Sequence, residues 1–423
     1  MNKALRKEKR AERRQRTKGR LRHHLSFKFA RLALHSYLVN KFNFSHDLIE
    51  SPYSPYVVVS NHLTNWDPLL IGMSFNKESM YYVATDHVFR MGLKSKLLKF
   101  FFSPIPRVKT INETFTVITI FRRLKENLNI CIFAEGNTSF DGETGEVLPS
   151  ICKLVKKSGV ALITYRFTGS YLSFPRWARF MRRGRISGRL VKIYSPEELA
   201  AMSEDEIYAT IEKDIYVNAY DEQKKDPVAY RGKRPAEFLE TALYCCPQCK
   251  QFATLTSEDD ELFCSCGFRV KYNEYGCFEY PAPANNEKPP FQTILDWSKW
   301  QRNEIGVLAE KVTASGGNVP IFGDQDQTLF QIARASHNTL LANGTLSMYH
   351  NRISVTTASG QVFEFPLDTI VDMSIITMKT IIFSTRENKI YEIHSNQPRS
   401  ALKYLELFKA IKGPLYSTDQ AES

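Results

Sequence analysis

Short apolar runs and amphipathic segments alternate along the first half of the chain. Four runs are rich in β-branched and aromatic residues, which is typical of buried strands, and they span residues 55–60, 81–85, 129–134 and 160–167. Apolar positions that recur every three or four residues predict helices near 68–76, 88–102, 112–128 and 149–158. Strands that alternate with helices form a mainly parallel sheet with flanking helices, so we predict an α/β unit that ends near residue 235.

A further helix is predicted before the first strand. Within residues 23–50, apolar residues such as Phe27, Leu34 and Leu38 recur at helical intervals between basic positions. An amphipathic helix of this kind either packs on its own domain or docks on a membrane, and the pattern leaves both open. We include this helix in the α/β domain, which we place at residues 23–235.

The C-terminal half of the chain has a different pattern. Residues 281–299 begin with the proline-rich segment PAPANNEKPP, which predicts a linker. From residue 300 to 412, many short strand-like segments precede one helix, which predicts a small β-barrel-like domain with a C-terminal helix. This order of elements resembles pleckstrin-homology and GRAM-type domains, and it leaves open a role in lipid contact or a purely structural role.

The composition narrows the class of protein. The 423 residues are 43% hydrophobic and 24% charged, which is typical of a globular chain with several domains. No apolar run approaches the roughly 20 residues of a membrane-spanning helix, and no signal-peptide pattern follows the N-terminus. We therefore expect a cytoplasmic protein that is peripheral on the inner face of the cell membrane.

Positive charge is concentrated at the N-terminus. The formal net charge is +12, and residues 1–30 hold twelve Lys or Arg against Glu8 and Glu12. Such a run binds anionic partners, so we predict that residues 1–22 are a basic tail, disordered or on a membrane surface, that meets lipid headgroups or nucleic acid. A second basic stretch, 176–192, is interleaved with aromatic residues and suits either a membrane interface or a solvated loop.

One polar block follows the first predicted strand. Residues 61–68 read NHLTNWDP, and ligands of open α/β sheets gather at the carboxyl ends of strands. His62 is a candidate general base, with Asp67 as the carboxylate that holds its other ring nitrogen. The alternative is an ordinary hydrogen-bonded pair in which Asp67 only caps a helix.

A second polar block ends the third predicted strand. Residues 133–139 read FAEGNTS, and a glycine-containing turn at a strand end can offer backbone N–H groups to an anion. Glu135 is a candidate to orient a substrate hydroxyl. The alternative is a plain polar turn.

Together the two blocks resemble the glycerolipid acyltransferase family, specifically the 1-acyl-sn-glycerol-3-phosphate acyltransferases. The pattern N-H-x-x-x-x-D-P, followed by a strand that ends in F-x-E-G, carries the resemblance, which covers roughly residues 30–235. It implies that His62 is the catalytic base and Asp67 its partner, and that Arg107 at the end of the segment FSPIPR contacts a phosphate. It assigns acceptor binding to Glu135 and Gly136, and we predict that Asn137 and Thr138 in the same turn bind substrate as well.

The second block departs from the family pattern. Where the family has threonine and arginine after the glycine, this chain has Asn137 and Thr138, so that arginine is absent. The strand at 160–165 also lacks the proline of the family's fourth block. A phosphate headgroup would then rely on Arg107 or on the basic stretch 176–189, and the identity of the acceptor is less well determined than the type of reaction.

Five of the eight cysteines lie between residues 245 and 266. Two close pairs separated by a hairpin-sized insert indicate a Cys₄ zinc site, so we predict a zinc-ribbon-like module at 242–280 with a structural zinc ion. The predicted ligands are Cys246, Cys249, Cys264 and Cys266. The second pair is one residue tighter than usual, which leaves Cys245 and Cys277 as substitutes, and a redox dithiol fits only the first pair.

The resemblance implies a reaction in phospholipid biosynthesis. A fatty acyl group would move from acyl-CoA or acyl carrier protein to a lysophospholipid hydroxyl, converting lysophosphatidate to phosphatidate, without a catalytic cofactor. The expected partners are an anionic membrane surface and the two substrates, and nucleic acid is not expected. Two alternatives remain open, namely a nucleic-acid-binding zinc-ribbon protein and a catalytically inactive lipid-binding scaffold.

Overall fold

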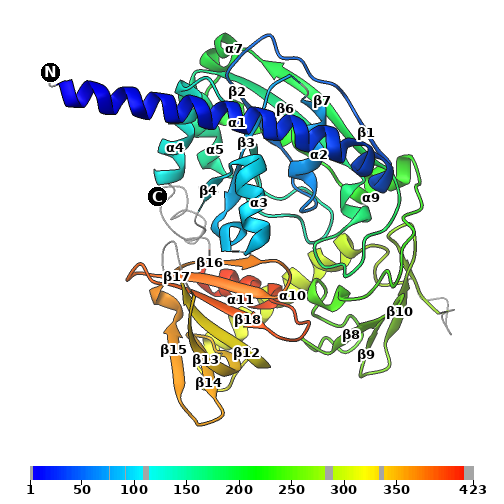
Figure 1. The fold of residues 1–423 in the computed structure, drawn as a ribbon. Coiled ribbons are helices and arrows are strands. Elements are labelled where there is room, and N and C mark those ends of the chain that lie inside the picture. The colour runs from blue at the N-terminus through cyan, green and yellow to red at the C-terminus, as the bar shows by residue number, and fades with distance from the viewer. Residues whose placement is uncertain are drawn as a thin grey trace.

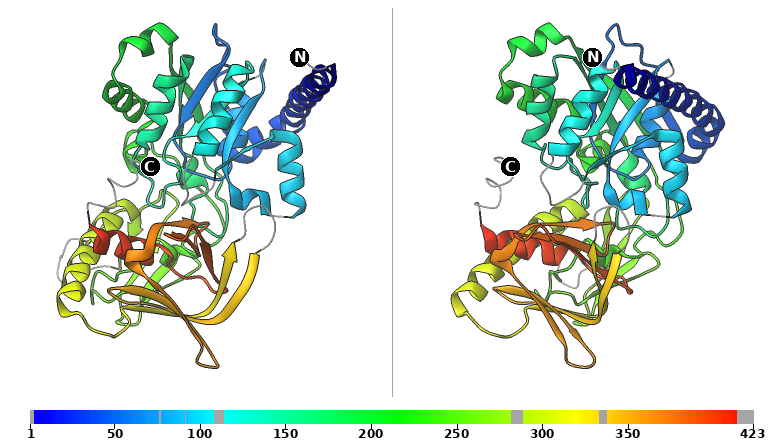
Figure 2. Two further views of the ribbon diagram at one scale, coloured as in Figure 1. Left: turned by 90° about the vertical axis from the view of Figure 1, so that its left-hand side faces the viewer. Right: turned by 60° about the vertical axis from the view of Figure 1, so that its left-hand side comes forward.

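The structure is a computed structural model, and it places an α/β unit above a large antiparallel sheet, with a small cysteine-bearing sheet at their side (Figure 1). Two further views show the same order of the two main lobes (Figure 2). The residues that it describes are 3–75, 77–90, 92–107, 114–281, 289–332 and 338–413, without the side chains of 3–18, 86 and 94.

A seven-stranded sheet forms the centre of the α/β unit, in the order β1-β7-β6-β2-β5-β3-β4. All neighbouring strands in it run parallel except β6 and β7, which confirms the predicted mainly parallel sheet. The strands are β1 (Phe44–His46), β2 (Tyr56–Ser60), β3 (Met80–Thr85), β4 (Ile105–Arg107), β5 (Asn129–Phe133), β6 (Ala161–Thr168) and β7 (Ile186–Tyr194).

Helices cover both faces of this sheet because successive side chains of its strands point to opposite sides. Val58 and Cys131 belong to the hydrophobic cluster that includes residues of α1 and α2, whereas Val59 and Ile132 belong to the cluster of α4, α5 and α8. The helices are α1 (Lys3–Phe42), α2 (Asp67–Ser74), α3 (Leu93–Phe102), α4 (Thr114–Lys125), α5 (Pro149–Ser158), α6 (Ser170–Ser173), α7 (Pro196–Ala201), α8 (Glu204–Ile215) and α9 (Ala219–Lys225), with a 3₁₀ turn, η1, at Asp86–Arg90.

The helix α1 continues through the boundary that the sequence pattern placed at residue 22, so the basic segment from Lys3 onward is helical. Lys and Arg are good helix formers, which lets the helix extend beyond the part that packs on the domain. Phe27 and Leu38 on one side of α1 are buried, whereas Phe29 and Leu32 are exposed. The helix therefore packs on its own domain and keeps apolar side chains at the surface. No helix in the described part of the chain combines the length and apolarity that crossing a membrane requires.

The basic stretch 176–192 has one arginine built into the fold, whereas five of its seven Lys and Arg side chains are exposed. Its last part is strand β7, and Arg182 is 2% exposed with its guanidinium over the rings of Trp177 and Tyr272. Arg182 also donates to the Pro235 carbonyl. For this arginine, the expectation of a membrane interface or a solvated loop was wrong, because aromatic stacking and carbonyl acceptors pair the charge inside the protein.

A four-stranded antiparallel sheet follows the α/β unit, in the order β11-β10-β9-β8. A short 3₁₀ turn (Leu239–Thr241) precedes it. Its strands are β8 (Leu255–Glu258), β9 (Glu261–Cys264), β10 (Arg269–Tyr272) and β11 (Phe278–Glu279). Residues 282–288 of the predicted linker lie outside the described residues, and α10 (Ile294–Ser315) already begins within the range predicted as linker.

The C-terminal lobe is a seven-stranded antiparallel sheet that we call the C-terminal sheet, in the order β15-β14-β13-β12-β18-β17-β16. The strands and the closing helix are β12 (Phe322–Ile332), β13 (Asn338–Met348), β14 (Arg352–Thr357), β15 (Val362–Pro366), β16 (Ile370–Ile376), β17 (Thr380–Thr385), β18 (Ile390–Ser395) and α11 (Leu402–Lys412), with a 3₁₀ turn at Leu367–Thr369. The terminal helix was predicted and is present. A closed barrel is not confirmed, since β15 and β16 are the two edges of this sheet in the described residues.

Candidate active site

His62 and Asp67 meet at the carboxyl end of β2, as the first polar block predicts. The Nδ1 atom of His62 lies 3.0 Å from Oδ2 of Asp67. Because an ionised carboxylate only accepts hydrogen bonds, this contact assigns the proton to Nδ1 and leaves Nε2 with a lone pair. The imidazole also stacks on the ring of Phe133, with 4.3 Å between ring centroids. The ring is therefore held in both orientation and tautomer.

Asp67 is fully buried at the first residue of α2, and Pro68 follows it. Its Oδ2 accepts the backbone N–H groups of Leu63 and Thr64 at 2.7 and 2.8 Å. Burial raises the pKa of this carboxyl, and the hydrogen bonds from His62 and from the two backbone groups oppose that rise. The carboxylate thus closes the loop at residues 62–67 and holds the imidazole at the same time.

The second polar block lies directly against the first. Glu135 accepts the backbone N–H of His62 at 2.6 Å through Oε1 and that of Gly145 at 2.6 Å through Oε2. The backbone N–H of Ser139 donates to the His62 carbonyl. Both oxygens of Glu135 are therefore engaged with backbone, and burial raises its pKa to about 8 although the two backbone hydrogen bonds lower it. This geometry fits a residue that positions the His62 loop, whereas the sequence predicted a contact with substrate.

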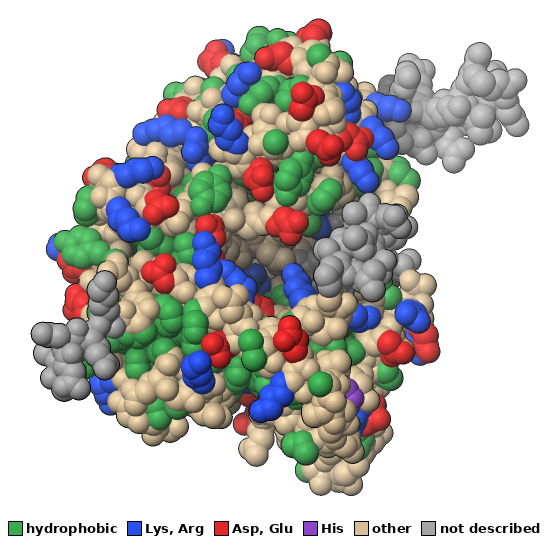
Figure 3. Space-filling view, turned by 180° about the vertical axis from the view of Figure 1, so that it is seen from behind, with side chains coloured by type: hydrophobic (Ala, Val, Ile, Leu, Met, Phe, Trp, Pro, Cys, Tyr) green, Lys and Arg blue, Asp and Glu red, His purple; other side chains and the backbone are tan. Residues whose placement is uncertain are grey.

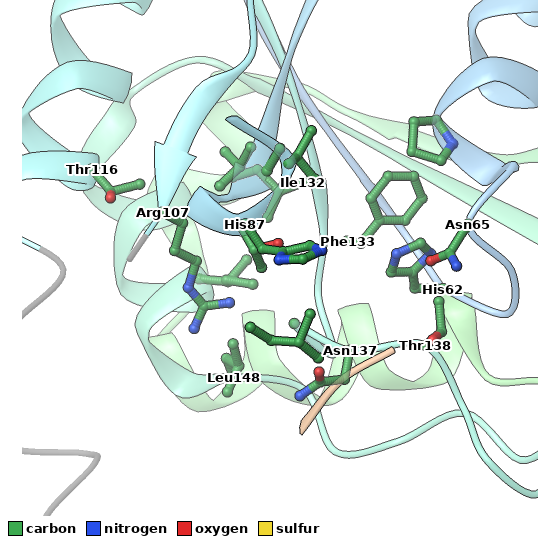
Figure 4. A pocket seen from close by; sticks show the side chains of 18 of the residues that line it. His62, Asn65, His87, Arg107, Thr116, Ile132, Phe133, Asn137, Thr138 and Leu148 are labelled. Atoms are coloured by element: carbon green, nitrogen blue, oxygen red, sulfur yellow. The ribbon is translucent and has the colours of Figure 1, made fainter. Parts of the chain in front are cut away.

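A cavity of about 410 Å³ lies at the carboxyl ends of the parallel strands, and His62 lines it. Much of its lining is aliphatic and comes from the sheet, α4 and α5, including Val83, Val117, Ile120, Ile132, Leu148 and Ile151. The close-up shows His62 and Asn65 on one side of this space and Arg107 on the other (Figure 4). An apolar cavity with a base and a guanidinium at different sides can hold an amphipathic substrate.

Arg107 ends the edge strand β4 and reaches the turn of the second block. Gly136 has a φ of +67°, and a Cβ atom built there would lie 2.7 Å from Nη1 of Arg107. A side chain at position 136 would therefore displace the guanidinium as well as strain the turn. Asn137 and Thr138 also line the cavity, so the structure brings Arg107 together with three of the four residues predicted to bind the acceptor.

Several lining residues were missed by the sequence analysis. His87 stands in η1 just beyond strand β3, where the rule that ligands gather at strand ends could have found it. The segment 375–377 of the C-terminal lobe also lines the cavity, and so does Arg176, which lies in the basic stretch already considered as a phosphate contact. No pattern in the sequence marks 375–377, because the segment reaches the site only through tertiary packing.

The four predicted cysteine ligands form one cluster in the structure. The Sγ atoms of Cys246 and Cys266 are 3.7 Å apart, those of Cys249 and Cys264 are 3.8 Å apart, and all four lie within 4.8 Å of one another. A tetrahedral ion with bonds of about 2.3 Å to sulfur requires sulfur atoms about 3.8 Å apart, so these thiols fit such an ion. Cys245 and Cys277, the substitutes considered from the sequence, are not in the cluster.

The surface is hollowed between the α/β unit and the C-terminal lobe when the molecule is seen from behind, and Lys and Arg side chains lie at the rim of this hollow (Figure 3). Positive charge at such a rim attracts anionic ligands. The site therefore combines an aliphatic cavity with basic surroundings.

A model of the Acyltransferase family matches residues 41–168, which include both polar blocks. No curated protein matches the chain. Among solved structures, the chain is similar to the 1-acyl-sn-glycerophosphate (LPA) acyltransferase PlsC from Thermotoga maritima, with 16% identity, a TM-score of 0.38 and coverage of 47% of this chain and 80% of that chain. It is also similar to the C-terminal domain of an unknown protein from Leishmania infantum, with 14% identity, a TM-score of 0.14 and coverage of 21% of this chain and 82% of that chain. The segment 41–168, which carries the paired blocks at His62 and Glu135, is therefore similar to the Acyltransferase family.

Proposed function

We propose that the protein transfers a fatty acyl group from acyl-CoA or acyl carrier protein to the hydroxyl of a lysophospholipid, with lysophosphatidate as the acceptor. The observation that carries this proposal is the pair His62 and Asp67 beside an aliphatic cavity that also holds Arg107. The base serves the hydroxyl, the aliphatic lining suits an acyl chain, and the guanidinium suits a phosphate.

In the proposed reaction, Nε2 of His62 takes the proton of the acceptor hydroxyl as its oxygen bonds to the thioester carbonyl carbon. The carbon–sulfur bond then breaks, and the departing thiolate takes the proton back from His62. Asp67 remains ionised and stabilises the imidazolium while it carries the proton, as a carboxylate does in other histidine-based sites. Glu135 and Asn61 position the loop from behind, since Asn61 is buried and exchanges two hydrogen bonds with the backbone of Phe167.

Arg107 is proposed to bind the acceptor phosphate. The family's motif arginine is absent from this chain, and Arg107 lies against the turn in which that arginine would stand. A guanidinium matches two phosphate oxygens at once, which would fix the headgroup relative to His62. Asn137 and Thr138 at the same turn are proposed to contact the acceptor as well.

Membrane association is proposed to use the exposed apolar side chains of α1, α3 and α4. They are Leu21, Leu25, Phe29, Leu32, Leu93, Leu97, Phe100, Phe115 and Ile118. The helices α1 and α3 pack side by side, and exposed apolar patches with basic neighbours are typical of membrane-contacting surfaces. When anionic vesicles are sedimented, the native chain should sediment with them, and much less of a Phe29→Glu variant should do so. Val307→Glu on α10 is the control and should sediment like the native chain. If Phe29→Glu also sediments like the native chain, this surface does not contact the membrane.

The four-cysteine cluster is proposed to hold a structural zinc ion. Four thiolates fill a tetrahedral coordination sphere, so the ion would support the small sheet and leave no position for substrate. Elemental analysis should find one zinc per chain, and a metal-free but fully folded protein would exclude this role.

The function is tested by incubating the protein with labelled acyl-CoA and lysophosphatidate. His62→Ala should lower kcat by about 10²–10⁴-fold, because general base catalysis typically contributes that much. His350→Ala is the matched control, since this partly exposed histidine lies in the C-terminal lobe, away from the cavity lining. Full turnover by His62→Ala would refute the assigned base. Vesicle binding without any turnover would favour the inactive scaffold, and tight RNA or duplex binding without turnover would favour the nucleic-acid-binding alternative.

A further inference from the structure

We propose that the C-terminal sheet is a wall of the acyl-chain cavity, and that Ile376 at the end of β16 determines which acyl chains the enzyme accepts. This inference rests on the proposed acyl transfer and adds a residue outside the acyltransferase domain to its specificity. Ile375, Ile376 and Thr377 all line the cavity that also contains His62. In the close-up, a piece of the C-terminal sheet (orange) passes beneath Asn137 and Thr138 (Figure 4).

Arg176 fastens this edge of the sheet to the second polar block. Its Nε donates to the Thr377 carbonyl at 2.6 Å and its Nη2 to the Ile375 carbonyl at 2.7 Å. The same guanidinium reaches the Thr138 carbonyl at 3.4 Å and lies over the ring of Phe140 at 4.2 Å. One planar cation thus joins the end of β16 to the turn that follows β5. Because its N–H groups point in fixed directions within one plane, this guanidinium holds the end of β16 next to the second polar block.

The strand register shows which face of the C-terminal sheet is turned toward the site. Ile376 pairs with Thr380, Ile382 pairs with Glu392, and Thr380 pairs with His394, so side chains at these positions share one face. Glu392 on that face is buried and forms an ion pair of 2.6 Å with Arg90 of η1, beside the cavity. The face that carries Ile376 is therefore the one that docks on the α/β unit.

A second set of charges holds the lobes together farther along the same loop. Arg302 of α10 forms an ion pair of 2.9 Å with Asp141, and Lys299 forms one of 2.9 Å with Glu143. Asp141 and Glu143 follow the second polar block directly. Because α10 packs against the strands of the C-terminal sheet, that sheet is attached both at the second polar block and just after it, which makes its position part of the geometry of the site.

Ile376 is 6% exposed and shares a small cluster with Ile332, Ile382 and Ile390, so its own side is packed and its other side meets the cavity. A larger side chain would shorten the cavity and a smaller one would lengthen it. One methylene group that fits or does not fit a hydrophobic pocket changes the ratio of kcat/KM between two substrates by roughly tenfold or more, so the effect is measurable. Val371 lies on the same strand but is 53% exposed, and it provides a matched control.

The experiment measures kcat/KM for saturated acyl-CoA donors of increasing chain length. Ile376→Trp should shift the preference toward shorter chains and Ile376→Ala toward longer chains, each by roughly tenfold in the ratio of kcat/KM for a long and a short donor. Val371→Trp should leave the ratio unchanged. An unchanged ratio in both Ile376 variants of an active enzyme would overturn the wall and leave the proposed function intact.

A second readout needs no turnover. In an Ile376→Cys variant, alkylation of residue 376 by iodoacetamide, followed by peptide mass spectrometry, should slow at least severalfold when long-chain acyl-CoA is added. A Val371→Cys variant should react at the same rate with and without the ligand. Alkylation at 376 that is indifferent to acyl-CoA would overturn the inference even for a protein without acyl transfer, whereas absent turnover in the native enzyme would count against the proposed function alone.

Discussion

The two walls of the cavity are held in different ways. In the α/β wall, backbone groups and buried side chains of neighbouring loops join the corner at His62 and Asp67, as in the hydrogen bonds from His62 to Glu135 and from Ser139 to His62. The C-terminal wall is attached mainly by charged side chains, among them Arg176 and Arg90. The residues of the proposed reaction therefore belong to one unit, and the enclosure of the cavity depends on charged side chains that join two units. Variants that remove contacts within the α/β unit should therefore affect the proposed reaction, whereas variants that remove the charged contacts should affect how the cavity is enclosed.

The largest expected effect is that of removing the proposed zinc ion, which acts on neither wall directly. The cysteine sheet supports the start of α10, since the indole of Trp297 donates to the Cys245 carbonyl at 2.9 Å. Structural zinc contributes about 10–16 kcal/mol to folding in small zinc modules, so chelation or Cys246→Ser should unfold this sheet and loosen the C-terminal wall. Differential scanning calorimetry should show a new transition at lower temperature, with Cys277→Ser as the control. A single unchanged transition after the zinc is removed would contradict this support.

A smaller effect is expected when one charge between the walls is removed. Glu392→Gln takes away the buried partner of Arg90, whose own side chain is 19% exposed. Removing one partner of a buried pair costs about 3–5 kcal/mol, and the lower end applies because Arg90 stays in contact with solvent. Hydrogen exchange should therefore increase in the turn at 377–379 and stay unchanged in β2 and β5.

Glu364→Gln is the control for that experiment, because Glu364 lies on the edge strand β15 and pairs with Arg352 at the surface. Equal protection of the turn at 377–379 in Glu392→Gln and in the control would mean that the charges do not hold the wall. Faster exchange in β2 as well would mean that the two walls form one cooperative unit.

The difference between the two walls also explains which features the sequence could predict. The corner at His62 and Asp67 and the turn at Glu135 are local patterns at strand ends, so spacing alone placed them at one edge of the sheet. The cysteine cluster is also local, and its four members follow from two close pairs. The contact of Arg176 with Thr377 joins residues that are far apart in the chain, and only the packing of the two lobes creates it.

Other misses have separate causes. The strands β1 and β4 contain three residues each, which is too short for an alternation of apolar and polar positions to stand out. The arginine at 182 looked solvated because a single sequence does not show that two aromatic rings and a carbonyl surround it. A charge can be recognised as buried only when its partners are known.

The smallest expected effect concerns a brace within the α/β wall. Glu135→Gln keeps the shape of the side chain but replaces one of its two acceptor oxygens with an NH₂ group, which leaves the N–H of His62 or of Gly145 without an acceptor. An unsatisfied buried donor costs about 1–3 kcal/mol, so the variant should be less stable by that amount, as measured by urea unfolding. The C-terminal wall should dock as before, because none of its attachments involves Glu135.

The pH dependence of the same variant sharpens this prediction. Burial raises the pKa of Glu135 from 4.5 to about 8, so between these values the folded chain holds a proton that the unfolded chain has lost. The contribution of this group to stability is therefore complete below the unfolded pKa and is lost as the pH rises through the folded pKa. Glutamine does not titrate, so the stability advantage of the native chain over Glu135→Gln should shrink from pH 5 to pH 8. A stability difference that grows from pH 5 to pH 8 would contradict this prediction. It would mean that the two backbone N–H groups outweigh burial and keep the Glu135 carboxylate ionised in the folded protein.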